Sequence, residues 1–356
     1  MGRSAMRSRL PWEVTTMATL LLTPDCDHPF PFAGNEISTP PGRSWTWENL
    51  IYLADFLWAS SQRQISLGGG EPALHPECLD FILYLLQRGF EVTVFTAGLI
   101  SSPRLEEFRR HLIGAPTERL TWVCNFRDPV RTPVSPAATR RLHRFLSVMG
   151  PWTQAGFTIN RLDFTLDFLF DHLSRFGLRR HLRLGLAQSA AGSQDRFALT
   201  DYVRRVVERL YRHRHLFEAH RVRPHFDCRF PPCAFSDAAL GWRRRLGDQG
   251  PYGCRPALVI GPDMGLSHCL PLAGYYTKSL FEFDSMEDVE RYFEKLRSQL
   301  KEGSPGIGAE CDDGLCRENR GCGGGDLCRV AGPCRGGAAQ RMAEGEDGIS
   351  PDRLPG

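Results

Sequence analysis

The sequence lacks a long apolar run, a strong charge of either sign, and a recognisable secretion signal. No stretch of about 18 apolar residues occurs, so nothing predicts a helix that spans a bilayer. The formal net charge is only +3, which is too small to favour a nucleic-acid or membrane partner. Residues 1–16 carry arginines but no apolar segment before a cleavage site, so we expect a cytoplasmic protein.

Cysteine is scarce over most of the chain and concentrated near its end. Only Cys26, Cys78 and Cys124 precede residue 228, whereas the other nine of the 12 cysteines lie between Cys228 and Cys334. Without a secretion signal, cysteines clustered in this way favour metal binding over disulfides. Cys78 and Cys124 fall within helix and strand patterns, which predicts buried apolar thiols.

What the sequence does contain is a repeating alternation of strand and helix signals. The continuous apolar run Ala18–Thr23 is typical of a strand buried on both faces. Further strands are predicted at residues 64–67, 91–95, 120–125, 156–160 and 181–187. Helical spacing of apolar residues follows each strand, finally over residues 199–219. Six such units predict an α/β fold, a partial (β/α)6 TIM-like barrel with its site at the strand C-terminal ends.

The pattern changes after the sixth helix, which indicates a second unit. We place the barrel at residues 17–225 and a small cysteine-rich domain at residues 226–334. Within the second unit, segments 257–260 and 266–270 flank a glycine-rich turn and predict a hairpin. Residues 1–16 are expected to be a flexible extension, and the polar residues 335–356 a disordered tail.

A glycine-rich turn followed by a carboxylate stands directly after the second predicted strand. It reads Gly68-Gly69-Gly70-Glu71-Pro72. Glycine lets a backbone approach a ligand closely, and a carboxylate there can accept hydrogen bonds from an ammonium group. A plain turn between a strand and a helix is the alternative interpretation.

This order of strand, glycine-glycine-glutamate-proline and helix resembles the radical S-adenosylmethionine (radical SAM) superfamily. The resemblance implies that Gly69, Gly70 and Glu71 bind the methionyl part of S-adenosylmethionine. The third predicted strand ends in Thr96-Ala97-Gly98, which looks like the threonine-asparagine-glycine found there in the superfamily. By the same resemblance, Asn125 and Asn160 at the ends of the fourth and fifth strands contact the ribose, carboxylate or adenine.

The loop after the first strand departs from the superfamily pattern of C-x3-C-x-aromatic-C. Cys26 matches the first cysteine and Phe32 matches the aromatic residue, but Phe30 and Ala33 occupy the other two cysteine positions. Neither side chain can ligate iron, whereas thiolates are the usual ligands of such clusters. His28 lies at the wrong offset. We therefore expect an impaired catalytic cluster site in which Cys26 is the remaining candidate ligand.

The later cysteines resemble the SPASM and related auxiliary-cluster domains that follow many radical SAM barrels. The resemblance implies one or more [4Fe–4S] clusters in the C-terminal domain. The candidate ligands are Cys228, Cys233, Cys254, Cys269, Cys311, Cys316, Cys322 and Cys328. A structural zinc site is the alternative, because four cysteines around a hairpin also suit tetrahedral zinc.

Three functional hypotheses follow. The first is a radical SAM-type enzyme that modifies a peptide or protein and receives electrons from a reductant protein. The second is a catalytically dead relative that acts as a partner, scaffold or electron carrier. The third is a zinc-stabilised binding domain. The arginine-rich helix face at residues 204–214 lacks interleaved aromatic residues, so it predicts a solvated surface and no nucleic-acid partner.

Overall fold

The computed structural model describes residues 18–25, 44–187, 200–227, 230, 234–247, 257–268 and 278–302, and the structural statements below concern these residues. Within them, no helix is both long enough and apolar enough to cross a membrane. The described strands form a single sheet in the order β10-β9-β8-β1-β2-β3-β4-β5-β6-β7. The chain therefore builds an α/β fold around one continuous sheet.

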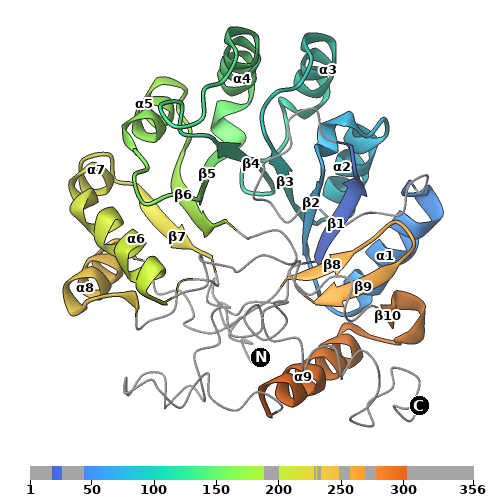
Figure 1. Cartoon of the computed structure of the whole chain (residues 1–356). Helices are drawn as coiled ribbons and strands as arrows, with labels where there is room; N and C mark the ends of the chain where they lie inside the picture. Colours follow the sequence, from blue (N-terminus) through green and yellow to red (C-terminus); the bar gives the residue numbers. More distant parts are fainter. Residues whose placement is uncertain are drawn as a thin grey trace, which may run out of the picture.

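Seven consecutive strands pair in parallel and form an open arc (Figure 1). They are β1 (Ala18–Thr23), β2 (Gln64–Gly69), β3 (Glu91–Thr96), β4 (Leu120–Phe126), β5 (Thr153–Ile159), β6 (Arg179–Leu186) and β7 (Arg223–Phe226). On the other side of β1, β8 (Leu258–Ile260) is parallel, and β9 (Gly265–His268) and β10 (Lys278–Ser279) continue antiparallel. The strands predicted from sequence at the first six positions are thus confirmed.

The helices that connect the parallel strands lie on the outer side of the arc (Figure 1). They are α1 (Trp47–Ala59), α2 (Cys78–Gln87), α3 (Ser102–Leu112), α4 (Pro136–Met149), α5 (Asp167–Arg175) and α6 (Thr200–Arg212). The chain continues with α7 (Arg214–Ala219), α8 (Asp237–Arg245) and α9 (Met286–Glu302), and with 3-10 turns η1 (Pro72–Leu74), η2 (Gly150–Trp152) and η6 (Leu280–Glu282).

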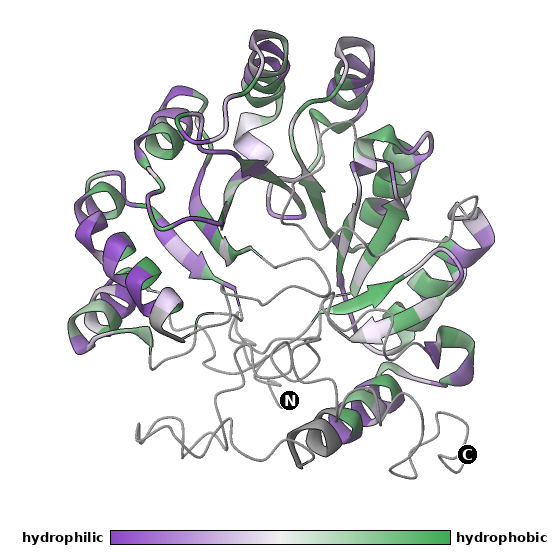
Figure 2. Ribbon diagram, viewed as in Figure 1, coloured by the Kyte–Doolittle hydropathy of each residue, from purple (hydrophilic) through white to green (hydrophobic). Residues whose placement is uncertain are grey.

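The core lies between the sheet and these outer helices. Alternate strand residues such as Leu20, Leu67, Trp122 and Leu184 are fully buried and belong to one hydrophobic cluster with the helices. Figure 2 shows hydrophobic residues concentrated in β1 and β8, and hydrophilic residues on the outward side of α6. Because side chains alternate across a strand, the opposite residues of each strand line the inner, concave face of the arc.

Local sequence signals account for several element ends. Thr46 caps α1 by accepting a hydrogen bond from the Asn49 backbone N–H, as predicted. Ser135 caps α4 by accepting from Ala138, and Ser285 accepts from the Asp288 backbone N–H at the start of α9. Each cap satisfies a backbone donor that the helix leaves unpaired.

The structure differs from the sequence-based expectation at three points. The helix predicted over residues 199–219 is interrupted at His213 and forms α6 and α7. The strand β7 was not predicted, because its four residues include Pro224 and offer no apolar run. The predicted hairpin is present as β8 and β9, but it is hydrogen-bonded to β1 and so extends the barrel sheet.

Candidate functional site

The predicted ligand-binding residues that the structure describes gather at one edge of the sheet. Gly69 ends β2 and is followed by Gly70 and Glu71, Asn125 lies near the end of β4, and Asn160 directly follows β5. In a parallel sheet these carboxyl ends share one edge, where sites in such folds lie. The candidate metal ligands Cys26, Cys228, Cys233, Cys254, Cys269, Cys311, Cys316, Cys322 and Cys328 lie outside the described residues.

The glycine turn after β2 is fastened to the end of β1. The backbone N–H of Gly70 donates to the Thr23 carbonyl over 2.7 Å, and the N–H of Glu71 donates to the Asp25 carbonyl over 2.7 Å. A Cβ on Gly70 would lie 2.0 Å from the Asp25 oxygen, and Gly69 adopts a φ of +102°. Side chains other than hydrogen are excluded at Gly70 by contact with the protein's own backbone.

Glu71 links the ends of β2 and β3. The residue is 7% exposed, and one carboxylate oxygen accepts hydrogen bonds from the Thr96 hydroxyl and the Ala97 N–H, both over 2.9 Å. The other oxygen accepts from the Ala73 N–H over 3.3 Å at the start of η1. We call this arrangement of Glu71 with Thr96 and Ala97 the Glu71 clasp. It positions the end of β3 relative to the glycine turn.

A buried histidine follows this turn. His75 accepts a hydrogen bond at Nδ1 from the Glu77 N–H. In a neutral ring the proton is then on Nε2, which donates to the Ser44 hydroxyl oxygen over 2.9 Å. Burial lowers the pKa of His75 below its usual range. The neutral ring therefore connects η1 to Ser44 at the start of the described segment before α1.

The inner face of the arc is polar where it approaches the strand ends. Arg183 of β6 forms an ion pair with Asp227 over 2.9 Å and stacks on the ring of Phe95 in β3, with its guanidinium carbon 5.1 Å from the ring centre. Gly185 makes room for Asp227, because a Cβ there would lie 2.7 Å from the Asp227 carboxylate. Residues of β3 and β6 and the residue that directly follows β7 are thus held together across the concave face.

Asn125 lies on the same face. Its carboxamide occupies the space above Gly156 of β5, whose added Cβ would lie 2.5 Å from Asn125 Oδ1. This oxygen is buried and has no hydrogen-bond partner in the described part of the protein. A buried acceptor without a donor is costly, so a donor from a bound molecule would stabilise it. Asn160 is partly buried beside the following loop.

Cys78 and Cys124 are free and buried, as predicted. Burial raises the pKa of the Cys78 thiol to about 12 and also raises the pKa of Cys124 strongly. Such thiols remain protonated and are poor metal ligands. Among the residues that the structure describes, no group of three metal-ligating side chains comes together.

These contacts decide how the described residues fit S-adenosylmethionine. The Glu71 carboxylate, which is the group of this turn that could accept from a ligand's ammonium group, already accepts three hydrogen bonds from protein donors, so most of its lone pairs are occupied in this arrangement. Asn125 is the predicted residue that offers a spare acceptor. Sequence reasoning missed the partners Phe95 and Asp227, the latter because it follows the unpredicted strand β7.

Comparison with known proteins reveals similarity in structure only. No family model matches the sequence, and no curated protein matches it. SuiB of Streptococcus suis bound to S-adenosylmethionine aligns with a TM-score of 0.52 and 14% identity, over 76% of this chain and 64% of SuiB. SuiB bound to the precursor peptide SuiA gives 0.53 and 12%, over 76% and 63%. Native anSMEcpe with bound AdoMet and a peptide gives 0.50 and 12%, over 71% and 74%.

The chain spans a little under two thirds of the length of SuiB. At these identities the comparisons show the fold, and they agree with the parallel sheet and outer helices described above. The protein therefore has an α/β fold with a parallel sheet of the radical SAM type.

Proposed function

We propose that this chain is an iron–sulfur protein of radical SAM/SPASM type that works with a peptide or protein but lacks a conventional catalytic cluster. The sequence of the first loop carries the proposal. Only Cys26 remains of three expected thiolates, with Phe30 and Ala33 at the other positions. A [4Fe–4S] cluster held by one protein ligand would lack the chelation that retains it.

The retained glycine-glutamate motif is compatible with this loss. A motif kept only for binding S-adenosylmethionine would argue for an active enzyme. Here Gly70 contacts the end of β1 and Glu71 forms the clasp, so both residues have reasons to be present that concern the fold alone. The motif can therefore persist in a barrel that no longer cleaves S-adenosylmethionine.

The cysteines from Cys228 to Cys334 supply ligands for an auxiliary cluster in this proposal. When bound, such a cluster would transfer electrons or stabilise the C-terminal region. The sharing of a fold with SuiB, solved with a precursor peptide, and with anSMEcpe, solved with a peptide, supports a peptide or protein as the partner. A scaffold or electron carrier in peptide modification fits these features best.

The experiment is an assay for 5′-deoxyadenosine after anaerobic reconstitution and strong reduction. The unmodified protein should form none, and Phe30→Cys with Ala33→Cys should restore the ligand spacing and give measurable cleavage. Each single substitution serves as the matched control and should do much less, because three ligands act as a unit. Sustained formation of 5′-deoxyadenosine by the unmodified protein would contradict the proposal.

A second candidate function is binding of S-adenosylmethionine or a related adenosyl compound without cleavage. The unpaired Asn125 oxygen and the polar inner face around Arg183 favour it. Isothermal calorimetry with S-adenosylmethionine should then detect binding that Asn125→Leu weakens. The absence of binding heat in the unmodified protein would eliminate this candidate.

A further inference from the structure

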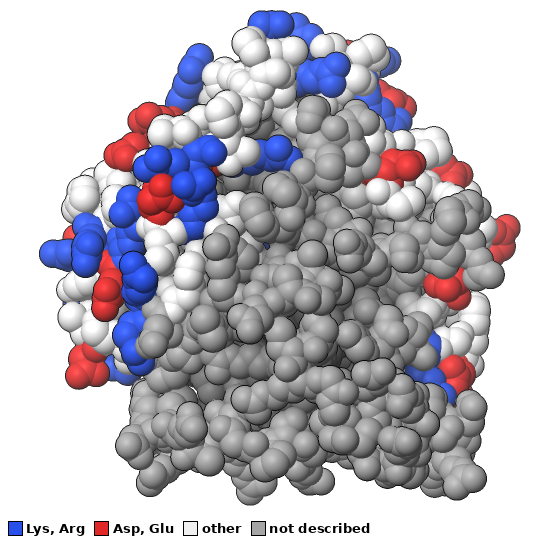
Figure 3. Space-filling view, viewed as in Figure 1, with Lys and Arg blue, Asp and Glu red and all other residues white. Residues whose placement is uncertain are grey.

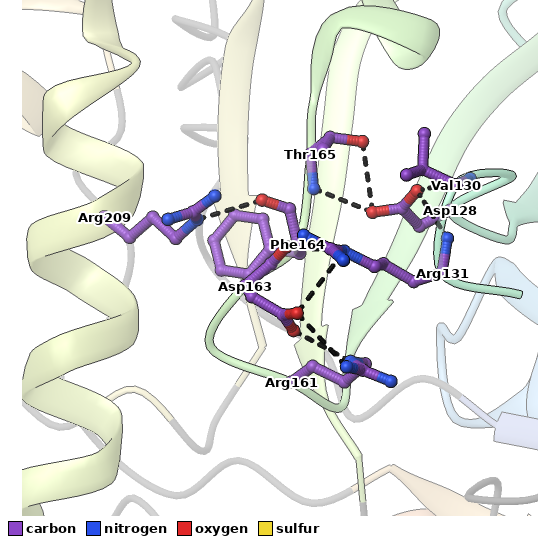
Figure 4. Close-up of polar contacts among 8 residues, drawn as sticks. All are labelled: Asp128, Val130, Arg131, Arg161, Asp163, Phe164, Thr165 and Arg209. Atoms are coloured by element: carbon purple, nitrogen blue, oxygen red, sulfur yellow. Dashed lines mark hydrogen bonds and ion pairs between the residues drawn. The ribbon is translucent and has the colours of Figure 1, made fainter.

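Two loops at the carboxyl edge of the sheet are joined by a buried aspartate (Figure 4). Asp128, in the loop after β4, is 6% exposed. Its carboxylate accepts hydrogen bonds from the Thr165 N–H over 2.7 Å and the Thr165 hydroxyl over 3.0 Å, in the loop after β5. It also accepts from the backbone N–H groups of Val130 and Arg131. The negative charge of Asp128 is thus used internally to fix the two loops together.

Two arginines on these loops share one carboxylate. Arg161 forms a bidentate pair with Asp163 over 2.8 and 3.1 Å, and Arg131 approaches the same carboxylate at 3.4 Å (Figure 4). The Arg131 and Arg161 side chains are 38% and 49% exposed. The terminal amino nitrogens of Arg131 have no hydrogen-bond partner in the described residues, so guanidinium donors exceed carboxylate acceptors here. We call Arg131, Arg161 and Asp163 the rim cluster.

The surroundings extend this excess of positive charge and add an apolar contact. Arg209 of α6 donates to the Phe164 carbonyl over 2.9 Å, which attaches the basic helix to the same loop. Figure 3 shows blue side chains around the start of α5 and along α6, with red side chains among them, and the first turn of α5 carries Asp167. Val130, in the first loop, is 66% exposed and offers an aliphatic side chain next to Arg131.

We propose that the rim cluster binds an acidic segment of a peptide or protein, with a carboxylate on Arg131 and Arg161 and an apolar side chain against Val130. Planar guanidinium groups bind carboxylates with defined geometry, and the loops are already fixed, so little ordering is required on binding. The exposed contact beside the arginines is aliphatic rather than aromatic, which suits a peptide better than nucleic-acid bases. This inference rests on the proposed function, since it names where and by what chemistry the peptide partner docks.

The rim cluster has a matched control on the outer face of α3. There Arg109 forms a bidentate pair with Glu106, and Arg110 approaches the same carboxylate at 3.9 Å. The composition is the same, two guanidiniums and one carboxylate, but the cluster lies on one helix rather than on the loops at the strand ends. Replacing these two arginines changes the net charge equally without touching the rim.

The test measures the binding of a short fluorescein-labelled peptide of alternating aspartate and leucine to the full chain, followed by fluorescence anisotropy. Arg131→Gln with Arg161→Gln should weaken binding about fivefold or more, whereas Arg109→Gln with Arg110→Gln should leave it unchanged. The conservative pair Arg131→Lys and Arg161→Lys should retain part of the binding. Asp163→Asn should tighten it about twofold or more, because the competing carboxylate is removed.

Several outcomes would overturn the inference. The first two are no binding of the acidic peptide, and equal binding of a peptide with lysine in place of aspartate. The third is an equal loss of peptide affinity in both double variants. The fourth is tighter binding of a labelled single-stranded RNA, abolished by the Arg131→Gln and Arg161→Gln double variant. Iron and sulfide are measured in the same samples. Peptide binding without iron would contradict the proposed function alone, and iron without peptide binding would contradict this inference alone.

Discussion

Replacing Glu71 by glutamine tests whether its carboxylate stabilises the fold or binds a ligand. Glu71 is 7% exposed, and its carboxylate accepts hydrogen bonds from Thr96, Ala97 and Ala73. Hydrogen bonds to a charged group contribute roughly 1.5–3 kcal/mol each, and glutamine must point its amino group at one of these donors. We therefore expect Glu71→Gln to lower the free energy of unfolding by about 2 kcal/mol, and Glu71→Ala by about 4 kcal/mol.

The assay is anaerobic urea unfolding followed by circular dichroism, with Glu106→Gln as the control. Glu106 also accepts hydrogen bonds, from Arg109, but it is exposed on α3, so its loss should hardly change the midpoint. Thr96→Val removes one donor to Glu71, and the double variant with Glu71→Gln should reveal a coupling of about 1 kcal/mol. An unchanged unfolding midpoint in Glu71→Gln would show that the Glu71 clasp does not stabilise the fold. Glu71 would then be better explained as a ligand-binding residue.

Three further predictions concern the same edge of the sheet and its buried groups. Gly70→Ala should cost at least about 3 kcal/mol of stability, because its Cβ would lie 2.0 Å from the Asp25 oxygen, while Gly114→Ala, with no atom within 4 Å, should be neutral in the same unfolding assay. Burial lowers the pKa of His75 in the folded protein, so the unfolded chain binds the proton at a higher pH than the folded protein does. The stability of the protein should therefore decline as the pH drops below about 6.5. Thermal melts should show a smaller decline in His75→Gln. Cys78 and Cys124 should resist alkylation in the native protein at pH values well below the Cys78 pKa of about 12, and Cys78→Ala with Cys124→Ala should leave the iron content unchanged; rapid labelling or loss of iron would disprove this.

Strong local patterns made most of the barrel predictable. Continuous apolar runs such as Ala18–Thr23 and helix caps such as Thr46 report on structure within a few residues, and both were confirmed. The strand β7 was not predictable from its own four residues, which carry no clear strand pattern. It forms because it pairs with β6, and local sequence does not reveal that pairing. The attachment of the hairpin to β1 likewise joins residues more than two hundred positions apart.

The positions of the candidate site residues in the fold could be predicted, but their contacts could not. Gly69, Gly70 and Glu71 lie at the strand end where the sequence placed them. That the Glu71 carboxylate binds Thr96 and Ala97 depends on how β2 and β3 meet in space, which the spacing of residues does not reveal. The rim cluster could not be predicted for the same reason, because its two arginines belong to loops that are separate in the sequence.

The most direct test of the central claim is the iron and acid-labile sulfide content of the anaerobically purified protein, compared with its Cys26→Ala variant. The account predicts iron and sulfide in the unmodified protein, bound by the cysteines after residue 227, and the same content in Cys26→Ala. Zinc without sulfide, or a loss of iron and sulfide in Cys26→Ala, would contradict it.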